Sequence, residues 1–260
     1  HGTMAAYQAA KEVILAYQAP EDVAVLNWDD PTVRAMAGRG HGRPLFYSVH
    51  ESLESGVYRD GSALVLASAG ERQVLCHDSD LRLRGLHNLG NAAAAAAAAV
   101  TLGAPPAAVA DGLKAFSGLP HRLEWIADKG GVTYYNDSKA TTPFSTQYAL
   151  QAFEQPVLLL AGGYDKGTPF NDLAHATQAR VRIALLYGNT ADKLAQALQR
   201  VPAPPEVILL PTLDDALRRA AELALPGDVV LLSPACASYD QFPHYEARGD
   251  HFRALVDELP

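Results

Sequence analysis

From residue 122 onward, short apolar runs alternate with longer amphipathic segments in a regular order. The pattern predicts strands near 132–136, 156–161, 182–187, 206–210 and 228–232, with helices near 143–152, 170–179, 190–199, 212–224 and 247–258. Strands and helices that alternate at this spacing build a mostly parallel sheet with helices on both faces. We therefore predict a Rossmann-like α/β domain over residues 120–260.

The first part of the chain has a different pattern. It predicts a helix over 5–17, a strand at 23–26, a helix from Pro31 with Asp30 as its N-cap, an antiparallel meander over 45–85, a helix of eight alanines opened by Asn91, and a helix over 106–116. Ser117-Gly-Leu-Pro is the expected boundary, so the first domain covers residues 1–119.

Composition and charge narrow the class of protein. Hydrophobic residues make up 48% of the chain and charged residues 19%, which is ordinary for a globular protein. The net charge of −8 argues against a nucleic-acid surface. The longest apolar stretch, 92–100, is far shorter than the roughly 20 residues of a membrane span. We expect a monomeric cytoplasmic protein with no nucleic-acid or membrane partner, in which Cys76 and Cys236 are buried thiols.

Asn136-Asp-Ser-Lys-Ala-Thr-Thr-Pro lies where a predicted strand passes into a predicted helix. Pro143 suits the first turn of that helix, and Thr141 or Thr142 is its expected N-cap. Free backbone amides and the positive end of a helix favour an anion at such a junction. An ordinary Asx turn at Asp137 followed by an N-cap is the alternative interpretation.

Two more polar loops follow other predicted strands: Gly162-Gly-Tyr-Asp-Lys and Ser233-Pro-Ala-Cys-Ala-Ser. Ligands of parallel sheets bind beyond the carboxyl ends of the strands. We expect the loops after the first and second strands to be neighbours that face one cleft, which would bring Thr141 and Lys166 together. The double glycine alone is a weak signal, because it often marks only a tight turn.

Together with Leu119-Pro-His-Arg, Tyr7-Gln-Ala-Ala-Lys, His87-Asn-Leu-Gly-Asn and Glu246-Ala-Arg-Gly-Asp-His-Phe, these loops resemble the Mur ligase family over nearly the whole chain, most closely its D-glutamate-adding branch. The chain contains no Gly-x-x-x-x-Gly-Lys-Ser/Thr loop, which the family carries upstream, after a UDP-binding domain. We therefore expect residues 1–119 to be the back part of an α/β ATPase-type central domain, and the 260-residue chain alone to be inactive.

The resemblance implies an ATP-dependent ligase of peptidoglycan precursor synthesis. Such an enzyme phosphorylates the carboxylate of UDP-N-acetylmuramoyl-L-alanine and joins D-glutamate to it, with Mg²⁺ as cofactor. The implied catalytic residues are Lys11, as a carbamate at the metal, and Lys139. The residues implied at the nucleotide are Asn91, Arg122 and Asp137, and those implied at D-glutamate are Thr141, Lys166, Ser238 and Tyr245.

Seven of these residues, all except Lys139 and Lys166, also have a simpler interpretation. Lys11 is then a solvated lysine, Asn91 a helix cap, Arg122 the partner of a carboxylate, Asp137 a turn residue, Thr141 an N-cap, Ser238 a turn residue and Tyr245 part of the core. Two other functions also remain open: a folylpolyglutamate synthase of the same architecture, and a non-catalytic binding module derived from a ligase. The Asp-Asn-Pro-Arg motif of the ligases that add diaminopimelate or lysine is absent from the sequence.

Overall fold

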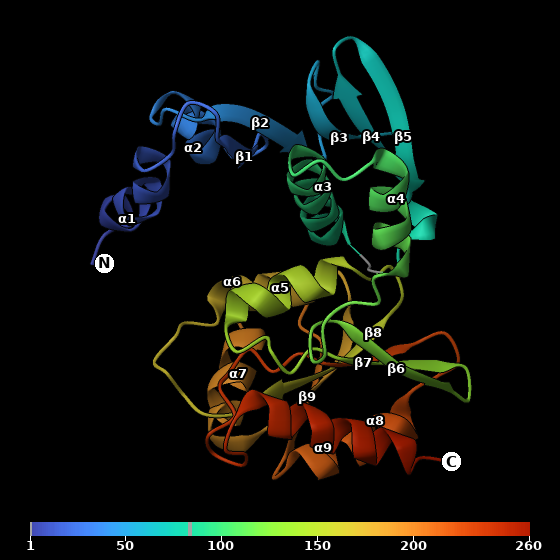
Figure 1. The fold of residues 1–260 in the computed structure, drawn as a ribbon. Coiled ribbons are helices and arrows are strands. Elements are labelled where there is room, and N and C mark those ends of the chain that lie inside the picture. Colours follow the sequence, from blue (N-terminus) through green and yellow to red (C-terminus); the bar gives the residue numbers. More distant parts are fainter. Residues whose placement is uncertain (1, 83–84) are drawn as a thin grey trace. The chain divides into compact units, whose positions relative to one another are not determined.

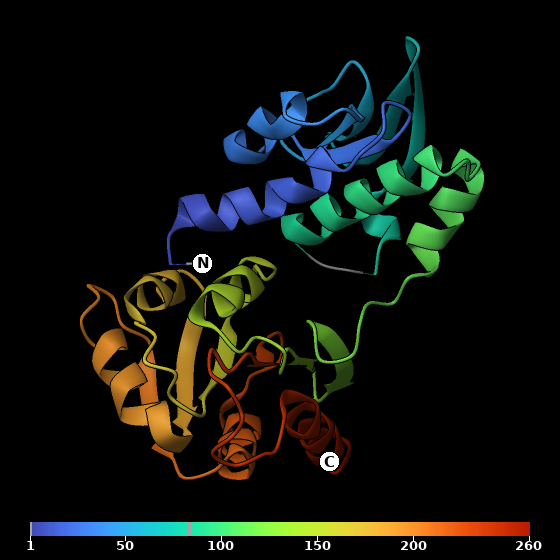
Figure 2. The same ribbon diagram turned by 60° about the vertical axis from the view of Figure 1, so that its left-hand side comes forward.

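The computed structural model describes residues 2–82 and 85–260 and divides into two compact units, His1–Ser117 and Gly118–Pro260. Each unit has its own sheet and its own hydrophobic core (Figure 1, Figure 2). Among the described residues, no helix combines the length and the hydropathy needed to cross a membrane.

The first unit is a five-stranded sheet with helices. Its elements are α1 (Met4–Ala16), β1 (Val23–Asn27), α2 (Pro31–Arg34), β2 (Arg43–Ser48), β3 (Gly56–Asp60), β4 (Ala63–Ser68), β5 (Glu71–His77), α3 (Leu86–Thr101) and α4 (Pro106–Ala115). The strand order is β1-β2-β3-β4-β5. β1, β2 and β3 are parallel, whereas β3, β4 and β5 are antiparallel.

The predicted antiparallel meander is therefore correct for β3–β5 and wrong for β2. Two-residue connections, 61–62 and 69–70, reverse the chain between the antiparallel strands. Residues 49–55 form a longer connection, which returns the chain to the edge at which β2 began, so that β3 runs parallel to it. The predicted N-cap of α2 is confirmed, because Asp30 accepts hydrogen bonds from the amides of Thr32 and Val33.

The polyalanine helix packs closely on this sheet, but it begins earlier than predicted. α3 starts at Leu86, directly after Gly85, whose φ of +91° interrupts the helical backbone. Asn91 is therefore inside the helix, and the prediction that it opens the helix is wrong. Buried alanines of α3, among them Ala93 and Ala96, share a core with β3, β4 and β5. Their small side chains let the helix approach the sheet closely.

The second unit is a six-stranded sheet between two layers of helices. Its elements are β6 (Glu124–Lys129), β7 (Val132–Asn136), α5 (Pro143–Gln151), β8 (Val157–Gly162), α6 (Asn171–Thr177), β9 (Val181–Tyr187), α7 (Ala191–Leu198), β10 (Glu206–Leu210), α8 (Leu213–Leu223), β11 (Val229–Leu232) and α9 (Tyr245–Asp257). All five predicted strands and all five predicted helices are confirmed to within two residues.

One strand of this unit was not predicted. β6 pairs antiparallel with β7 and forms the edge of the sheet. Gly130 and Gly131 connect the two strands, both with positive φ, as a tight hairpin requires. The mostly parallel sheet is confirmed, with this antiparallel strand added at its edge.

Helices cover both faces of the sheet in the second unit, as predicted (Figure 1). On one face, α5, α6 and α7 form a buried core with the strands through residues such as Leu150, Leu173 and Leu194. On the other face, α8 and α9 do the same through residues such as Leu217 and Phe252. The strands between them carry continuous apolar runs, as expected for a sheet buried on both faces.

The strand order β10-β9-β8-β11-β7-β6 determines which loops meet. β11 is inserted between β7 and β8, so the prediction that the first two predicted strands are neighbours is wrong. β11 is parallel to both of them, with Leu232 opposite Asn136 on one side and Leu160 on the other. The three loops that carry the motifs therefore leave the sheet at the same edge, from three adjacent strands.

Candidate functional site

A small pocket lies where the loops after β7, β8 and β11 meet. Its lining comes from all three loops: Thr141 after β7; Tyr164, Asp165, Lys166, Thr168 and Phe170 after β8; Ala235 and Cys236 after β11. The predicted cleft shared by Thr141 and Lys166 is therefore present, with the loop of β11 completing it. A lysine and a threonine hydroxyl at one pocket suit an anionic group.

The last residue of β7, Asn136, forms the turn that begins the loop after this strand. Asn136 Oδ1 accepts a hydrogen bond from the Ser138 amide at 3.1 Å, which makes the Asx turn that had been considered for Asp137. Thr142, not Thr141, is the N-cap of α5, since its side chain accepts from the Ser145 amide. Thr141 is thereby left free of a capping role and remains at the pocket.

Asp137 is buried and bonded within the protein. Its carboxylate accepts hydrogen bonds from Ser233 Oγ at 2.7 Å and from the Leu123 amide at 3.2 Å. Burial raises the pKa of Asp137 to about 7, and the hydrogen bond from Ser233 and the charges of Arg122 and Arg248 oppose that rise. The Asp137 side chain thus connects the loop after β7 to the residue that follows β11 and to the segment before β6, which contains Arg122.

The double glycine after β8 is a steric requirement. Gly162 and Gly163 both have φ near +138°. A Cβ at Gly162 would overlap the carbonyl oxygen of Tyr187, and one at Gly163 would overlap that of Ala237. The Tyr164 amide then donates to the Ala237 carbonyl at 2.8 Å. This close approach joins the loops after β8 and β11. The double glycine, a weak signal in the sequence, therefore marks a contact between two loops.

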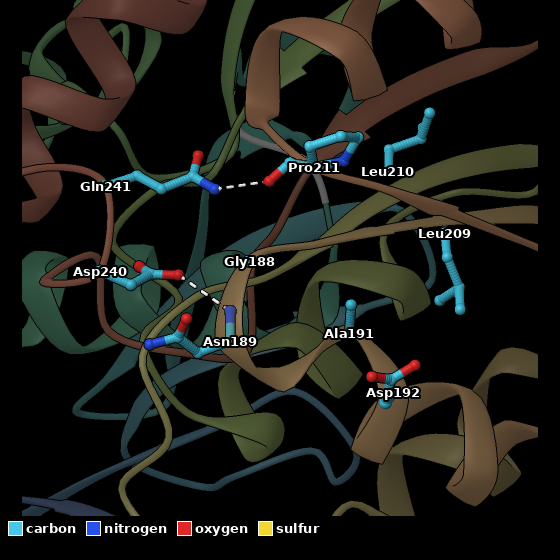
Figure 3. Close-up of a pocket in the computed structure, with 9 residues that line it drawn as sticks. All are labelled: Gly188, Asn189, Ala191, Asp192, Leu209, Leu210, Pro211, Asp240 and Gln241. Carbon is cyan, nitrogen blue, oxygen red and sulfur yellow. Dashed lines mark hydrogen bonds between the residues drawn. The ribbon is translucent and has the colours of Figure 1, made fainter.

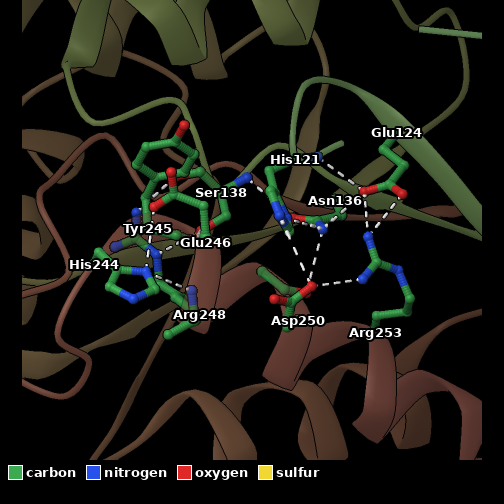
Figure 4. A network of polar contacts seen from close by, with 12 residues as sticks. His121, Glu124, Asn136, Ser138, His244, Tyr245, Glu246, Arg248, Asp250 and Arg253 are labelled. Atoms are coloured by element: carbon green, nitrogen blue, oxygen red, sulfur yellow. Dashed lines mark hydrogen bonds and ion pairs between the residues drawn. The ribbon is translucent and has the colours of Figure 1, made fainter. Parts of the chain in front are cut away.

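Arg248 joins the loop after β7 to the loop after β11. It lies on α9 and is fully buried, and its guanidinium donates to neutral groups of the neighbouring loops (Figure 4). Its guanidinium donates to Ser138 Oγ at 2.9 Å, to the Ser138 carbonyl at 2.7 Å and to the Cys236 carbonyl at 3.1 Å. Ser138 Oγ in turn donates to the Tyr245 carbonyl at 2.7 Å. Sequence reasoning missed this residue as part of the site, although it lies in a motif that carries the resemblance.

A second set of contacts supports the loop that contains Arg122 (Figure 4). His121 is buried, and its carbonyl accepts from the Lys139 amide at 3.0 Å. Asn136 Nδ2 lies 3.0 Å from His121 Nδ1 and donates to Glu124 Oε2 and to the Gly249 carbonyl. On its other side, His121 Nε2 lies 3.8 Å from Asp250 Oδ1. The network connects Lys139 to the loop in which Arg122 is exposed.

The remaining predicted residues of this unit lie around the same loops. Lys139 is exposed, and its ammonium lies 5.7 Å from the centroid of the Tyr245 ring. Tyr245 begins α9 and is half-buried rather than part of the core; its hydrogen bond to Glu246 raises the pKa of the phenol. Ser238 is buried in a turn in which its carbonyl accepts from the amides of Gln241 and Phe242.

Cys236 is a buried thiol, as predicted. It is buried and free, and Thr190 Oγ1 lies 3.3 Å from its sulfur. Burial raises the pKa of Cys236 to about 11, so the nucleophilic thiolate is disfavoured. Cys76, in the first unit, is also buried and free.

Lys11 and Asn91 belong to the first unit. Lys11 is exposed on α1, with its ammonium 5.3 Å from the centroid of the Tyr7 ring. Asn91 donates from Nδ2 to Asn88 Oδ1 at 3.2 Å along α3. Across the described ranges 2–82 and 85–260, no three His, Cys, Asp or Glu side chains are grouped as metal ligands.

A second, open pocket lies beyond the ends of β9 and β10 (Figure 3). Its lining includes Asp240 and Gln241, and both side chains are used to hold loops together. Asp240 Oδ2 accepts from the Asn189 amide at 3.2 Å, and Gln241 Nε2 donates to the Pro211 carbonyl at 2.9 Å. None of the residues predicted from the sequence lines this pocket.

Two domain families match the chain, one in each unit. Residues 1–99 match the Mur ligase middle domain, and residues 121–236 match the glutamate ligase domain of Mur ligases. The chain belongs to the Mur ligase family. Its relatives include the UDP-N-acetylmuramoylalanine–D-glutamate ligases of Pelotomaculum thermopropionicum, 40% identical over 259 residues, and Desulfitobacterium hafniense, 41% identical over 256 residues.

These matches cover 100% and 98% of the chain but only 57% and 56% of the two relatives. The chain thus spans a little over half the length of the curated proteins it matches. Solved structures show the same fold. A pseudomurein peptide ligase from Methanothermus fervidus superposes with a TM-score of 0.72 at 16% identity, covering 99% of this chain and 60% of the other.

A folylpolyglutamate synthase from Mycobacterium tuberculosis, solved with ADP and AMPPCP, superposes with a TM-score of 0.67 at 22% identity, covering 100% of this chain and 61% of that one. At such identities the likeness concerns the fold alone. The α/β architecture predicted from the sequence is therefore confirmed.

Proposed function

We propose that the chain is the back part of an ATP-dependent ligase that adds D-glutamate to UDP-N-acetylmuramoyl-L-alanine in peptidoglycan precursor synthesis. Residues 1–119 are the C-terminal part of its central, ATP-binding domain, and residues 120–260 are its amino-acid-binding domain. The observation that carries the proposal is the pocket at which Thr141 and Lys166 meet, in a chain about 40% identical to named D-glutamate ligases.

The chemistry of the loops fits a dianionic amino acid. Lys166 supplies positive charge at the pocket, and Thr141 supplies a directional hydroxyl. Ser238 lies in the loop after β11, and Tyr245 is the first residue of α9. Lys139 lies on the loop after β7, where its charge suits the acyl phosphate that precedes amide formation. The amine of D-glutamate attacks that acyl phosphate, forming the amide bond and releasing phosphate.

The nucleotide is assigned to Asn91, Arg122 and Asp137. Arg122 is exposed and can reach a phosphate, whereas Asp137 is bonded to Ser233 and Leu123, so a contact with the ribose requires that carboxylate to exchange partners. ATP and Mg²⁺ complete the proposed reaction. Lys11, as a carbamate, is assigned to the metal, for which the described residues offer no carboxylate cluster. The protein acts as a monomer in the cytoplasm, with no nucleic-acid or membrane partner.

A ligation assay on the complete gene product tests the proposal. UDP-N-acetylmuramoyl-L-alanine, Mg-ATP and one amino acid at a time (D-glutamate, L-glutamate, lysine or diaminopimelate) are supplied, and the product is identified by its mass. We expect a product with D-glutamate and little with the others. A parallel reaction supplies a folate in place of UDP-N-acetylmuramoyl-L-alanine, and addition of L-glutamate to it would establish the folylpolyglutamate synthase alternative, which the fold similarity keeps open. No ligation of any amino acid would favour a binding module.

A further inference from the structure

The loop after β8 places a carboxylate beside the lysine of the pocket. Asp165 directly precedes Lys166, and both side chains are exposed at the lining of the same pocket. A free carboxylate there would repel an anionic ligand and would compete for the lysine charge. Within residues 2–82 and 85–260, however, the ion pair that the structure gives Asp165 is with another lysine, and Lys166 is in none.

That other lysine is Lys193, in the first turn of α7. Its Nζ lies 3.1 Å from Asp165 Oδ1 and 3.0 Å from Oδ2, so it contacts both oxygens. It also lies 5.4 Å from the centroid of the Phe170 ring, which is 4% exposed and lines the pocket. The ammonium is thus held between a carboxylate and an aromatic ring.

Asp165 also shapes the turn that presents Lys166. Its Oδ1 accepts a hydrogen bond from the Gly167 amide at 2.7 Å, an Asx turn with Lys166 at its centre. The hydrogen bond from Lys193 holds the pKa of Asp165 below its usual value, and the Gly167 amide adds to this effect. The carboxylate therefore stays ionised and depends on Lys193 for its counter-charge.

We infer that Lys193 is a positioning residue of the amino-acid site: its ammonium neutralises Asp165, so that the charge of Lys166 remains available to the carboxylate of the incoming amino acid. This inference rests on the proposed function. It concerns charge rather than shape, so it predicts that removing the Asp165 charge makes Lys193 dispensable.

Four variants of the complete gene product separate charge from shape. Lys193→Met should raise the KM for D-glutamate about two- to fivefold, a range set by the weak coupling of exposed ion pairs, with kcat and the KM for ATP unchanged. Lys193→Arg should restore the KM. Asp165→Asn should lower it, because the charge of Lys193 is then unpaired beside the pocket, while asparagine still accepts from the Gly167 amide. Lys193→Met in the Asp165→Asn background should return to the value of the unchanged protein.

The dependence of KM on ionic strength distinguishes an electrostatic role of Lys193 from a purely structural one. The KM difference between Lys193→Met and the unchanged protein should shrink as ionic strength rises from about 0.02 M to about 0.5 M, because exposed charges are screened. Lys114→Met is the matched control, since Lys114 forms an exposed pair with Asp80 in the first unit, at 3.7 Å. It should change no constant.

An unchanged D-glutamate KM in Lys193→Met overturns the inference. So does a double variant that remains as impaired as Lys193→Met, because the defect would then not come from an uncompensated carboxylate. If the unchanged protein does not use D-glutamate, the proposed function fails and the inference fails with it. Normal use of D-glutamate, together with no effect of Lys193→Met, rejects the inference alone.

Discussion

Replacing Asp137 by asparagine should make the second unit more stable at neutral pH and should remove part of its pH dependence. The carboxyl group is buried, at 5% exposure, and its pKa is raised to about 7 from a usual value of 3.8. Asparagine has nearly the same shape, can accept from the Leu123 amide and can donate to Ser233 Oγ. It therefore imitates the protonated acid and carries no charge to bury.

The sign and the size follow from proton linkage. Because the folded state binds the Asp137 proton more tightly than the unfolded chain, this group stabilises the protein fully below pH about 4 and loses that contribution as the pH rises to about 7. A shift of about three pKa units corresponds to a free energy on the order of 4 kcal/mol. Between about pH 5 and about pH 8, the difference between the two proteins should change by about 2–3 kcal/mol.

Urea unfolding across that pH range measures the difference. The chain has two tryptophans, Trp28 in the first unit and Trp125 on β6, so a Trp28→Phe background lets fluorescence report on the second unit alone. Asp172→Asn, a change at an exposed acid on α6, is the matched control and should leave the pH profile unchanged. Parallel profiles for Asp137→Asn and its parent would refute the reasoning, because a carboxyl group with an ordinary pKa makes no such difference.

Two further predictions concern the chemistry. The 260-residue chain alone, which contains no phosphate-binding Gly-x-x-x-x-Gly-Lys-Ser/Thr loop, should release no phosphate above background from Mg-ATP with UDP-N-acetylmuramoyl-L-alanine and D-glutamate; a colorimetric phosphate assay measures this, and clear release would contradict it. In the complete gene product, oxygen-18 in the substrate carboxylate should appear in the released phosphate by mass spectrometry. Label retained wholly in the product would rule out the acyl phosphate.

The parallel sheet of the second unit was predictable because its signals are local and strong. Buried parallel strands are continuous apolar runs, and amphipathic helices separate them. The hairpin of β6 was missed, although Gly130-Gly131 between two strand-like runs is a recognised signal for one. The insertion of β11 between β7 and β8 could not be predicted in this way, since strand order depends on contacts that are distant in sequence.

Two of the residues that line the pocket, Thr141 and Lys166, were predicted as site residues, whereas Arg248 and Asn136, which hold its loops, were not. Lys166 and Thr141 stand in motifs at strand ends, where polar residues are conspicuous. Arg248 and Asn136 act through hydrogen bonds to residues on other elements, Ser138 and Gly249 among them. Asn91 was misplaced because Leu86–Gly90 precede it in the same helix, and only the positive φ of Gly85 marks the true start.

The central claim is that the loops after β7, β8 and β11 bind D-glutamate, and steady-state kinetics of two variants test it most directly. A charge-assisted hydrogen bond to a carboxylate contributes about 1.5–3 kcal/mol and a neutral one about 0.5–1.5 kcal/mol. In the complete gene product, Lys166→Ala should therefore raise the KM for D-glutamate more than Thr141→Ala does, and both should leave the KM for ATP nearly unchanged. An unchanged KM for D-glutamate in Lys166→Ala, with a raised KM for ATP, would contradict the account and would assign Lys166 to the nucleotide.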